Sequence, residues 1–155
     1  MTSGETTFIR RAMETDTPAL EQLFLEARIR AFHWCDPSSF LRSDFSIQTE
    51  GEIVHLAEDS RGSLLGFISV WRLENFIHHL YIAPGHQRAG VGSQLLRSLQ
   101  PWLPLPHRLK CLSKNETALS FYRKHGWTTQ GRGSDALGDY LVMEYDGGAA
   151  GCERG

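Results

Sequence analysis

The sequence predicts a single domain of mixed α/β fold. Its 155 residues and mass of 17.5 kDa suit one ordinary domain that can bury a core of its own. Hydrophobic residues make up 41% of the chain and charged residues 22%, which excludes a disordered or fibrous protein. A helical N-terminal portion precedes a meander of strand candidates, and strands then alternate with helices, an order typical of mixed α/β domains.

The N-terminal portion is expected to hold a strand, a helix and a lid-like segment. Residues 7–12 have the composition of a short strand. Asp16 or Thr17 is placed to cap a helix with Pro18 in its first turn, and apolar residues at three- and four-residue steps give that helix one buried stripe. Residues 32–45 are aromatic and rich in turn formers, so we expect them to pack as a lid or a short second helix.

The remaining elements follow from the same patterns. A hairpin loop at 59–62 separates two of the strand candidates. Strands are expected over residues 53–58, 63–71, 76–83, 108–113 and 140–145, and helices over residues 90–103 and 115–125. No linker divides the chain, so we expect one domain over residues 1–146 and a flexible tail over 147–155.

The composition narrows the classes of partner and compartment. A net charge of −2 argues against a protein that binds nucleic acid through a strongly basic face. No apolar run is long enough to span a bilayer, and no apolar segment follows the N-terminal basic residues, so we expect neither a membrane partner nor a secretory signal. Cys35, Cys111 and Cys152 form no CxxC pair, which favours reduced thiols and a cytoplasmic location. A homodimer is left open.

The most informative stretch is residues 80–92, in which a strand ends in a glycine-rich turn before an amphipathic helix. Gly90 and Gly92 allow a ligand to approach the backbone closely, and the helix start behind them offers free N–H groups and a positive dipole end. These features predict a pyrophosphate site, to which Arg88 can add a cation. The competing interpretation is a helix start whose glycines serve only packing.

Two other phosphate-binding motifs do not fit this stretch. A P-loop requires Lys and Ser/Thr after its last glycine, whereas Gly92 is followed by Ser93 and Gln94. A dinucleotide-binding fold requires GxGxxG at its first strand-to-helix turn and an acidic residue on the next strand. Here only GxG is present, deep in the chain, and residues 108–113 contain no acid.

Two motifs together resemble the GNAT superfamily of acyl-CoA-dependent N-acetyltransferases. The family signature Gln/Arg-x-x-Gly-x-Gly/Ala corresponds to residues 87–92, and its Asn, small residue and Tyr correspond to Asn115, Ala118 and Tyr122. The resemblance covers about residues 50–145. It implies a mixed, mostly antiparallel sheet that is splayed between its fourth and fifth strands, with helices on both faces and acetyl-CoA bound in the splay as co-substrate, without a metal.

The resemblance also implies which residues contact the cofactor. The strand residues Leu80, Tyr81 and Ile82 would pair with the pantetheine arm through their backbone, and the turn would hold the pyrophosphate through Gln87, Arg88, Ala89, Gly90, Val91, Gly92 and Ser93. Asn115 would reach the pantetheine, and Ala118 and Phe121 would line its path. A helix cap by Asn115 and core positions for the other two explain the same residues equally well.

The implied chemistry is attack of a neutral amine on a thioester. Because an alkylamine with a pKa of about 10.4 is protonated at pH 7, the reaction needs a base or a proton wire. Tyr122 corresponds to the family's usual acid for the departing thiolate, with a core tyrosine as the alternative. The resemblance implies His78 as the base, because some members place a catalytic His at its position, whereas Phe76 stands where many others carry Glu. Strand alternation sends His78 and His79 to opposite faces, and His79, Glu74, a water chain or a purely structural role for His78 remain open.

The acceptor is constrained only weakly by the sequence. The candidate acceptor-site residues are His33, Trp34, Trp71, Glu74 and His79. Six acids against one arginine between residues 36 and 59 would favour a cationic amine if they lined the cleft, and otherwise form a solvated face. A small-molecule amine and a peptide or protein amine both fit. A non-catalytic acyl-CoA-binding sensor or partner module is the alternative function, whereas the seven histidines show no metal-ligand spacing.

Overall fold

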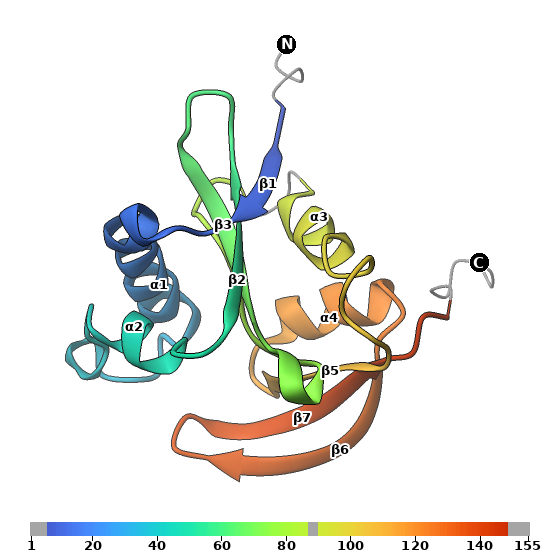
Figure 1. The fold of residues 1–155 in the computed structure, drawn as a ribbon. Coiled ribbons are helices and arrows are strands. Elements are labelled where there is room, and N and C mark those ends of the chain that lie inside the picture. The colour runs from blue at the N-terminus through green and yellow to red at the C-terminus, as the bar shows by residue number, and fades with distance from the viewer. Residues whose placement is uncertain (1–5, 87–89, 149–155) are drawn as a thin grey trace.

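The computed structural model describes residues 6–86 and 90–148, and there it forms one seven-stranded sheet with helices on both faces (Figure 1). The strands are β1 (Phe8–Arg11), β2 (Ile53–Glu58), β3 (Leu64–Trp71), β4 (Phe76–Ile82), β5 (His107–Leu112), β6 (Thr128–Asp135) and β7 (Gly138–Tyr145), in the spatial order β1-β2-β3-β4-β5-β7-β6. The predicted mixed α/β fold is confirmed. Most of the expected tail, residues 149–155, lies outside the described residues, as do Gln87, Arg88 and Ala89.

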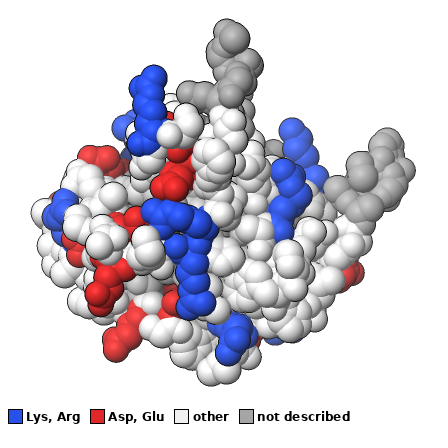
Figure 2. Space-filling model, turned by 45° about the horizontal axis from the view of Figure 1, so that its top comes forward, with Lys and Arg blue, Asp and Glu red and all other residues white. Residues whose placement is uncertain are grey.

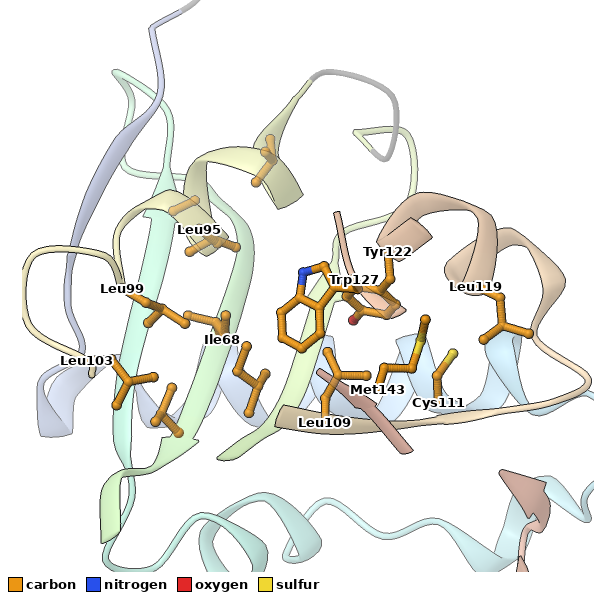
Figure 3. Close-up of a cluster of buried hydrophobic side chains, with 14 of the residues drawn as sticks. Ile68, Leu95, Leu99, Leu103, Leu109, Cys111, Leu119, Tyr122, Trp127 and Met143 are labelled. Carbon is orange, nitrogen blue, oxygen red and sulfur yellow. The ribbon is translucent and has the colours of Figure 1, made fainter. Parts of the chain in front are cut away.

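Two hydrophobic cores lie on opposite faces of the sheet. On one face, α1 (Thr17–Ala31) and α2 (Asp44–Gln48) enclose an aromatic cluster centred on Phe24, Phe45 and Phe67. On the other, α3 (Val91–Arg97) and α4 (Glu116–Lys124) cover a larger cluster that contains Leu95, Leu119, Tyr122 and Trp127 (Figure 3). Short 3-10 turns at Glu14–Asp16, Pro37–Ser39 and Arg72–Glu74 complete the elements.

The sheet opens between β4 and β5, its only parallel pair among the described strands. These strands pair through just two positions, Phe76 with Arg108 and Ile77 with Leu109. Beyond Ile77 the facing edges are no longer joined, so each strand has backbone groups that its neighbour does not satisfy. The splay expected between the fourth and fifth strands is therefore present.

Several expected boundaries differ from the structure. The helix predicted over residues 90–103 is regular only from Val91 to Arg97 and continues to Leu103 as turns whose N–H groups bond three or four residues back. β6 was not predicted, because its sequence TTQGRGSD contains no large apolar residue. It is an edge strand that pairs only with β7, so it needs no buried face.

Asp16 is the N-cap residue of α1, as expected, but its carboxylate does not cap the helix through a hydrogen bond. It receives hydrogen bonds from Arg10 instead, at 2.8 and 2.9 Å. The ion pair therefore ties the strand β1 to the start of the helix.

Charged residues form no continuous patch of one sign on the face shown in Figure 2, where basic and acidic side chains lie intermixed. Among the described residues, no helix has the length and apolar character required to cross a bilayer. The same residues include no cluster of three or more His, Cys, Asp or Glu side chains that could hold a metal ion.

Candidate active site

A cleft of about 660 Å³ lies where β4 and β5 separate. Strand residues 76–81 and 109–112 line it, together with the start of α4. The aromatic segment 32–40, the helices α1 and α2 and the β6–β7 hairpin contribute the remaining walls. The segment expected to form a lid thus lies beside the opening in the sheet.

The edge of β4 presents backbone groups to this cleft. The N–H of Ala83 donates to the carbonyl of Leu65 at 2.7 Å, so Ala83 turns its main-chain groups toward β3. Because these groups alternate in direction along a strand, those of Leu80 and Ile82 point toward the opening. They are two of the three residues that the family resemblance assigns to pantetheine pairing, and by the same alternation the main-chain groups of the third, Tyr81, point toward β3. Tyr81 packs its ring in the aromatic core, and burial raises the pKa of its hydroxyl.

His78 and His79 do not point to opposite faces, so that part of the sequence prediction was wrong. Ser69 pairs with His79 while the next residue of β3, Val70, pairs with Ile77, which leaves His78 as an extra residue in a β-bulge. The two imidazoles stack with ring centroids 3.9 Å apart, and both line the cleft. A bulge breaks the two-residue alternation on which the prediction rested.

His78 is oriented by a carboxylate that the sequence did not single out for this role. Its Nδ1 lies 2.7 Å from Oε2 of Glu52, whose side chain is only 7% exposed. A carboxylate oxygen accepts, so Nδ1 carries the proton and Nε2 of the neutral ring keeps its lone pair. The other oxygen of Glu52, Oε1, is buried without a partner among the described residues. The pair joins residues 26 positions apart, and no local spacing signals it.

His79 lies in a setting that suppresses proton uptake. His79 is 8% exposed. Its ring packs edge to face with the ring of Phe24, with centroids 4.8 Å apart. Burial, reinforced by His78 and Arg28, lowers the pKa of His79 to about 2. Its Nε2 is buried without a partner in the described part of the chain. His79 therefore remains a neutral wall of the cleft.

Tyr122 lines the same cleft from α4 and is 8% exposed. Its ring packs edge to face against Trp127, with centroids 5.6 Å apart (Figure 3). Burial raises the pKa of the Tyr122 hydroxyl well above its usual value, so the hydroxyl keeps its proton and can donate it. The sequence interpretations of Tyr122 as a core residue and as an acid are compatible with this single position.

The glycine turn has two different local constraints. Gly90 adopts a left-handed conformation with φ of +82°, and a Cβ placed there would meet none of the described residues within 4 Å. A Cβ on Gly92 would lie 3.1 Å from the ring of Phe121, so this glycine permits close contact between α3 and α4. The packing interpretation thus applies to Gly92, while Gly90 leaves open space above the backbone. Val91 is buried at the helix start.

Ser93 connects the two helices of this region. Its Oγ lies 2.7 Å from Nε2 of His125, whose Nδ1 lies 2.8 Å from the carbonyl of Phe121. That carbonyl can only accept, so Nδ1 carries the proton and, in the neutral ring, the Ser93 hydroxyl donates to Nε2. Ser93 is thus engaged within the protein rather than free at the turn.

Asn115 and Ala118 both line the cleft at the start of α4. The Asn115 side-chain oxygen accepts from the N–H of Ala118 at 3.2 Å and caps the helix. The capping interpretation therefore accounts for its oxygen, while its amide nitrogen has no hydrogen bond to the described part of the chain.

The other acceptor-site candidates lie around the cleft rather than in its lining. Trp34 donates from Nε1 to the carbonyl of Leu137 at 3.0 Å and joins the aromatic segment to the β6–β7 hairpin. His33 packs edge to face on Trp34, with ring centroids 5.2 Å apart. Trp71 packs over the backbone of Gly51, and Glu74 ends a 3-10 turn before β4. Of the five candidates, only His79 is among the lining residues.

The acids between residues 36 and 59 do not form one surface. Asp36 and Asp59 accept backbone hydrogen bonds in turns, and Glu58 pairs with Arg10 at 3.0 Å. Asp44 lines the cleft but pairs with Arg28 at 2.7 Å, and Glu52 bonds His78. Of the six acids, only Asp44 is among the described residues that line the cleft, where it pairs with Arg28.

The fold and cleft define a class of protein in which a sheet opens between two parallel strands to expose one strand edge and a tyrosine. The sequence model described as "Acetyltransferase (GNAT) domain" matches residues 50–129. This chain belongs to the GNAT acetyltransferase family. No curated protein matches the sequence.

Solved GNAT structures share the whole fold at low sequence identity. PaiA N-acetyltransferase from Thermoplasma acidophilum, in complex with coenzyme A, is 20% identical with a TM-score of 0.77, over 91% of this chain and 99% of that one. Apo YjaB from Escherichia coli is 20% identical with a TM-score of 0.74, over 92% and 99%. A GCN5-related N-acetyltransferase from Rhodopseudomonas palustris is 17% identical with a TM-score of 0.76, over 91% and 96%.

Proposed function

We propose that this protein transfers an acetyl group from acetyl-CoA to a primary amine by direct attack of the amine on the thioester. The observation that carries the proposal is that one cleft contains both an imidazole held by a carboxylate and a buried phenol that retains its proton. His78 with Glu52 and Tyr122 provide these groups. The acceptor is a small-molecule or peptide amine.

His78 acts as the base in this proposal. Its Nε2 lone pair accepts a proton from the acceptor ammonium or amine, directly or through water, while Glu52 holds Nδ1–H and stabilises the imidazolium that forms. Glu52 touches neither substrate in this arrangement and is a positioning residue. The neutral ring of His79 stacks on His78 and limits its rotation.

Tyr122 acts as the acid. The bound co-substrate supplies the thioester, in which the amine nitrogen forms a bond to the carbonyl carbon and the carbon–sulfur bond breaks. The Tyr122 hydroxyl donates its proton to the departing sulfur and regains one from solvent afterwards. A phenol keeps its proton at neutral pH, and burial, which raises the pKa of Tyr122, favours this protonated form further.

The chain offers a cofactor site that fits this chemistry. Leu80 and Ile82 present main-chain donors and acceptors along the open edge of β4, as a pantetheine amide requires. A Cβ on Gly90 would meet none of the described residues within 4 Å, and Asn115 lines the cleft at the start of α4. We propose that these groups hold the co-substrate, together with Gln87, Arg88 and Ala89 outside the described residues.

The test combines binding with turnover. Isothermal titration should show acetyl-CoA binding, and a thiol-release assay with a panel of amines should show CoA formation that depends on the acceptor. Mass spectrometry should find the product heavier by one acetyl group. Binding of acetyl-CoA with no thiol release from any amine in the panel would contradict acetyl transfer and favour the non-catalytic acyl-CoA-binding module. Absence of binding would contradict both.

A further inference from the structure

The wall of the cleft formed by α1 carries a buried guanidinium that the proposed reaction does not use. Arg28 is 6% exposed and lines the cleft. Its Cζ lies 4.0 Å from the ring centroid of Phe24 and 4.7 Å from that of Phe40. Two aromatic faces therefore fix the plane of the guanidinium, which limits the entropy lost when it binds a ligand.

The described chain provides hydrogen-bond acceptors for only some of the N–H donors of the Arg28 guanidinium. Nη2 donates to Oδ2 of Asp44 at 2.7 Å, and Nε is buried without an acceptor among the described residues. The same Asp44 oxygen also accepts the N–H of Leu41 at 2.9 Å, so it is shared between two donors. A guanidinium has five N–H donors, and leaving buried donors unpaired is costly. Arg28 thus has binding capacity that the described chain does not use.

Arg28 and the proposed base lie along one continuous wall. The ring of Phe24 contacts both the guanidinium of Arg28 and, in an edge-to-face arrangement, the ring of His79, which stacks directly on His78. An acceptor that extends from His78 along this wall, past His79 and Phe24, would place its other end near Arg28. The ring of Phe40, also in the lining, covers the guanidinium from the lid segment.

We propose that Arg28 binds a carboxylate of the acceptor, so that the acceptor is an amino acid or a similar small amine that carries a carboxylate. This inference rests on the proposed acetyl transfer and specifies its substrate class. A guanidinium pairs with a carboxylate through parallel hydrogen bonds.

The first arm of the test compares matched acceptors on the wild-type enzyme. A series of α-, β- and γ-amino acids is assayed beside the corresponding amides with saturating acetyl-CoA, and rates are expressed per neutral amine. The amide keeps the nucleophile and removes the negative charge. We expect kcat/KM for the best amino acid to exceed that for its amide by about 10- to 100-fold.

The second arm changes the protein. Arg28→Lys keeps a cation beside Asp44 but loses the planar fork, and we expect it to reduce the preference for acid over amide to a few-fold or less with acetyl-CoA affinity unchanged. Arg30→Lys, at an exposed position on the same helix, is the matched control and should keep the wild-type preference. Thermal melting verifies that each variant is folded.

The outcomes separate this inference from the function on which it rests. Equal turnover of amides and amino acids, or an unchanged preference in folded Arg28→Lys, would overturn the carboxylate site while acetyl transfer stands. If the enzyme acetylated only amines that carry no carboxylate, the carboxylate site would likewise be overturned while acetyl transfer stands. Failure of acetyl-CoA to bind, with no thiol release from any amine, would overturn the proposed function and this inference together.

Discussion

At the scale of single residues, two adjacent histidines acquire different chemistry from their contacts. The side chain of His78 is 37% exposed and bonds a carboxylate, whereas His79 is buried against Phe24 and its pKa falls to about 2. A ring that resists protonation so strongly is a poor base near neutral pH. In the proposed reaction we therefore assign the role of base to His78, although both rings line the cleft.

Substitution of the base and of its partner should give two distinguishable results. His78→Ala should lower kcat by about 10²- to 10⁴-fold and change the pH dependence of the rate. Glu52→Gln should lower kcat less, because a neutral amide still accepts from Nδ1–H but stabilises the imidazolium weakly. Steady-state kinetics across pH measure both.

Acetyl-CoA affinity should be unchanged in these two variants. His55→Ala serves as the control, since His55 bonds Ser98 and does not line the cleft. A pH–rate profile of His78→Ala identical to that of the wild type would place the base elsewhere, at Glu74 or a water chain.

Tyr122→Phe removes one oxygen and preserves the packing against Trp127. Because the hydroxyl is proposed to protonate the departing thiolate, kcat should fall by about 10²- to 10⁴-fold while acetyl-CoA affinity and thermal stability stay near wild type. Single-turnover kinetics isolate the chemical step. An unaffected chemical step would leave Tyr122 only its role in the core.

The sequence predicted these site residues unevenly. His78 and Tyr122 were found through the family motifs, and the structure places both in one cleft. Glu52 was not given a role, because its contact with His78 joins the start of β2 to β4 and depends on tertiary packing. The stacking of His78 on His79 was missed because a β-bulge arises from the pairing of two strands, which periodicity along one strand does not report.

At the scale of elements, the start of α3 depends on two glycines with different requirements. Gly90 needs a left-handed backbone, and Gly92 needs the absence of a side chain where Phe121 packs. A bulky residue at Gly92 would displace Phe121 and destabilise the helix pair, so an effect on the cofactor there would be indirect. Gly90 is the cleaner probe of the proposed pyrophosphate site.

Gly90→Ala can be matched with Gly62→Ala. Both glycines have φ of +82°, and a Cβ at either meets nothing within 4 Å, but Gly62 lies in the β2–β3 turn. Each substitution should cost about 1–2 kcal/mol of stability through backbone strain. Only Gly90→Ala should weaken acetyl-CoA binding, as measured by titration calorimetry. Equal affinities for the two variants would contradict a cofactor role for this turn.

Prediction of the elements succeeded where burial imposes a pattern. The helices α1 and α4 and the strands β2 to β5 each bury a face, and the sequence placed them within a few residues. β6 has almost no buried side chains and is held by its pairing with β7, so hydrophobic periodicity could not reveal it. α3 loses regular helix after Arg97, although Leu99 and Leu103 continue the buried stripe.

At the scale of the whole molecule, the sheet separates two cores, and each is built differently. The core under α3 and α4 is mainly aliphatic, whereas the one under α1 and α2 is aromatic and contains the buried His79. The alternation of elements predicted the layers, but the opening of the sheet came only from the family resemblance. It arises because β4 and β5 stop pairing after two positions, which no single strand encodes.

The last prediction concerns acid stability and follows from His79. In the folded protein its pKa is lowered to about 2, mainly by burial, while an unfolded histidine titrates at about 6.5. Below about pH 6.5 the unfolded chain therefore binds a proton that the folded chain excludes, and this group lowers the free energy of unfolding by about 1.4 kcal/mol per pH unit until the folded pKa is reached. His79→Phe retains an aromatic ring beside Phe24 and removes this linkage. The free energy of unfolding of the variant should therefore fall less steeply with acidification, with a slope smaller than that of the wild type by the equivalent of about one bound proton. Urea unfolding between pH 7 and 5 measures the slopes, with His33→Gln, at an exposed histidine, as the control. Parallel slopes for wild type and His79→Phe would mean that His79 takes up a proton in the folded protein.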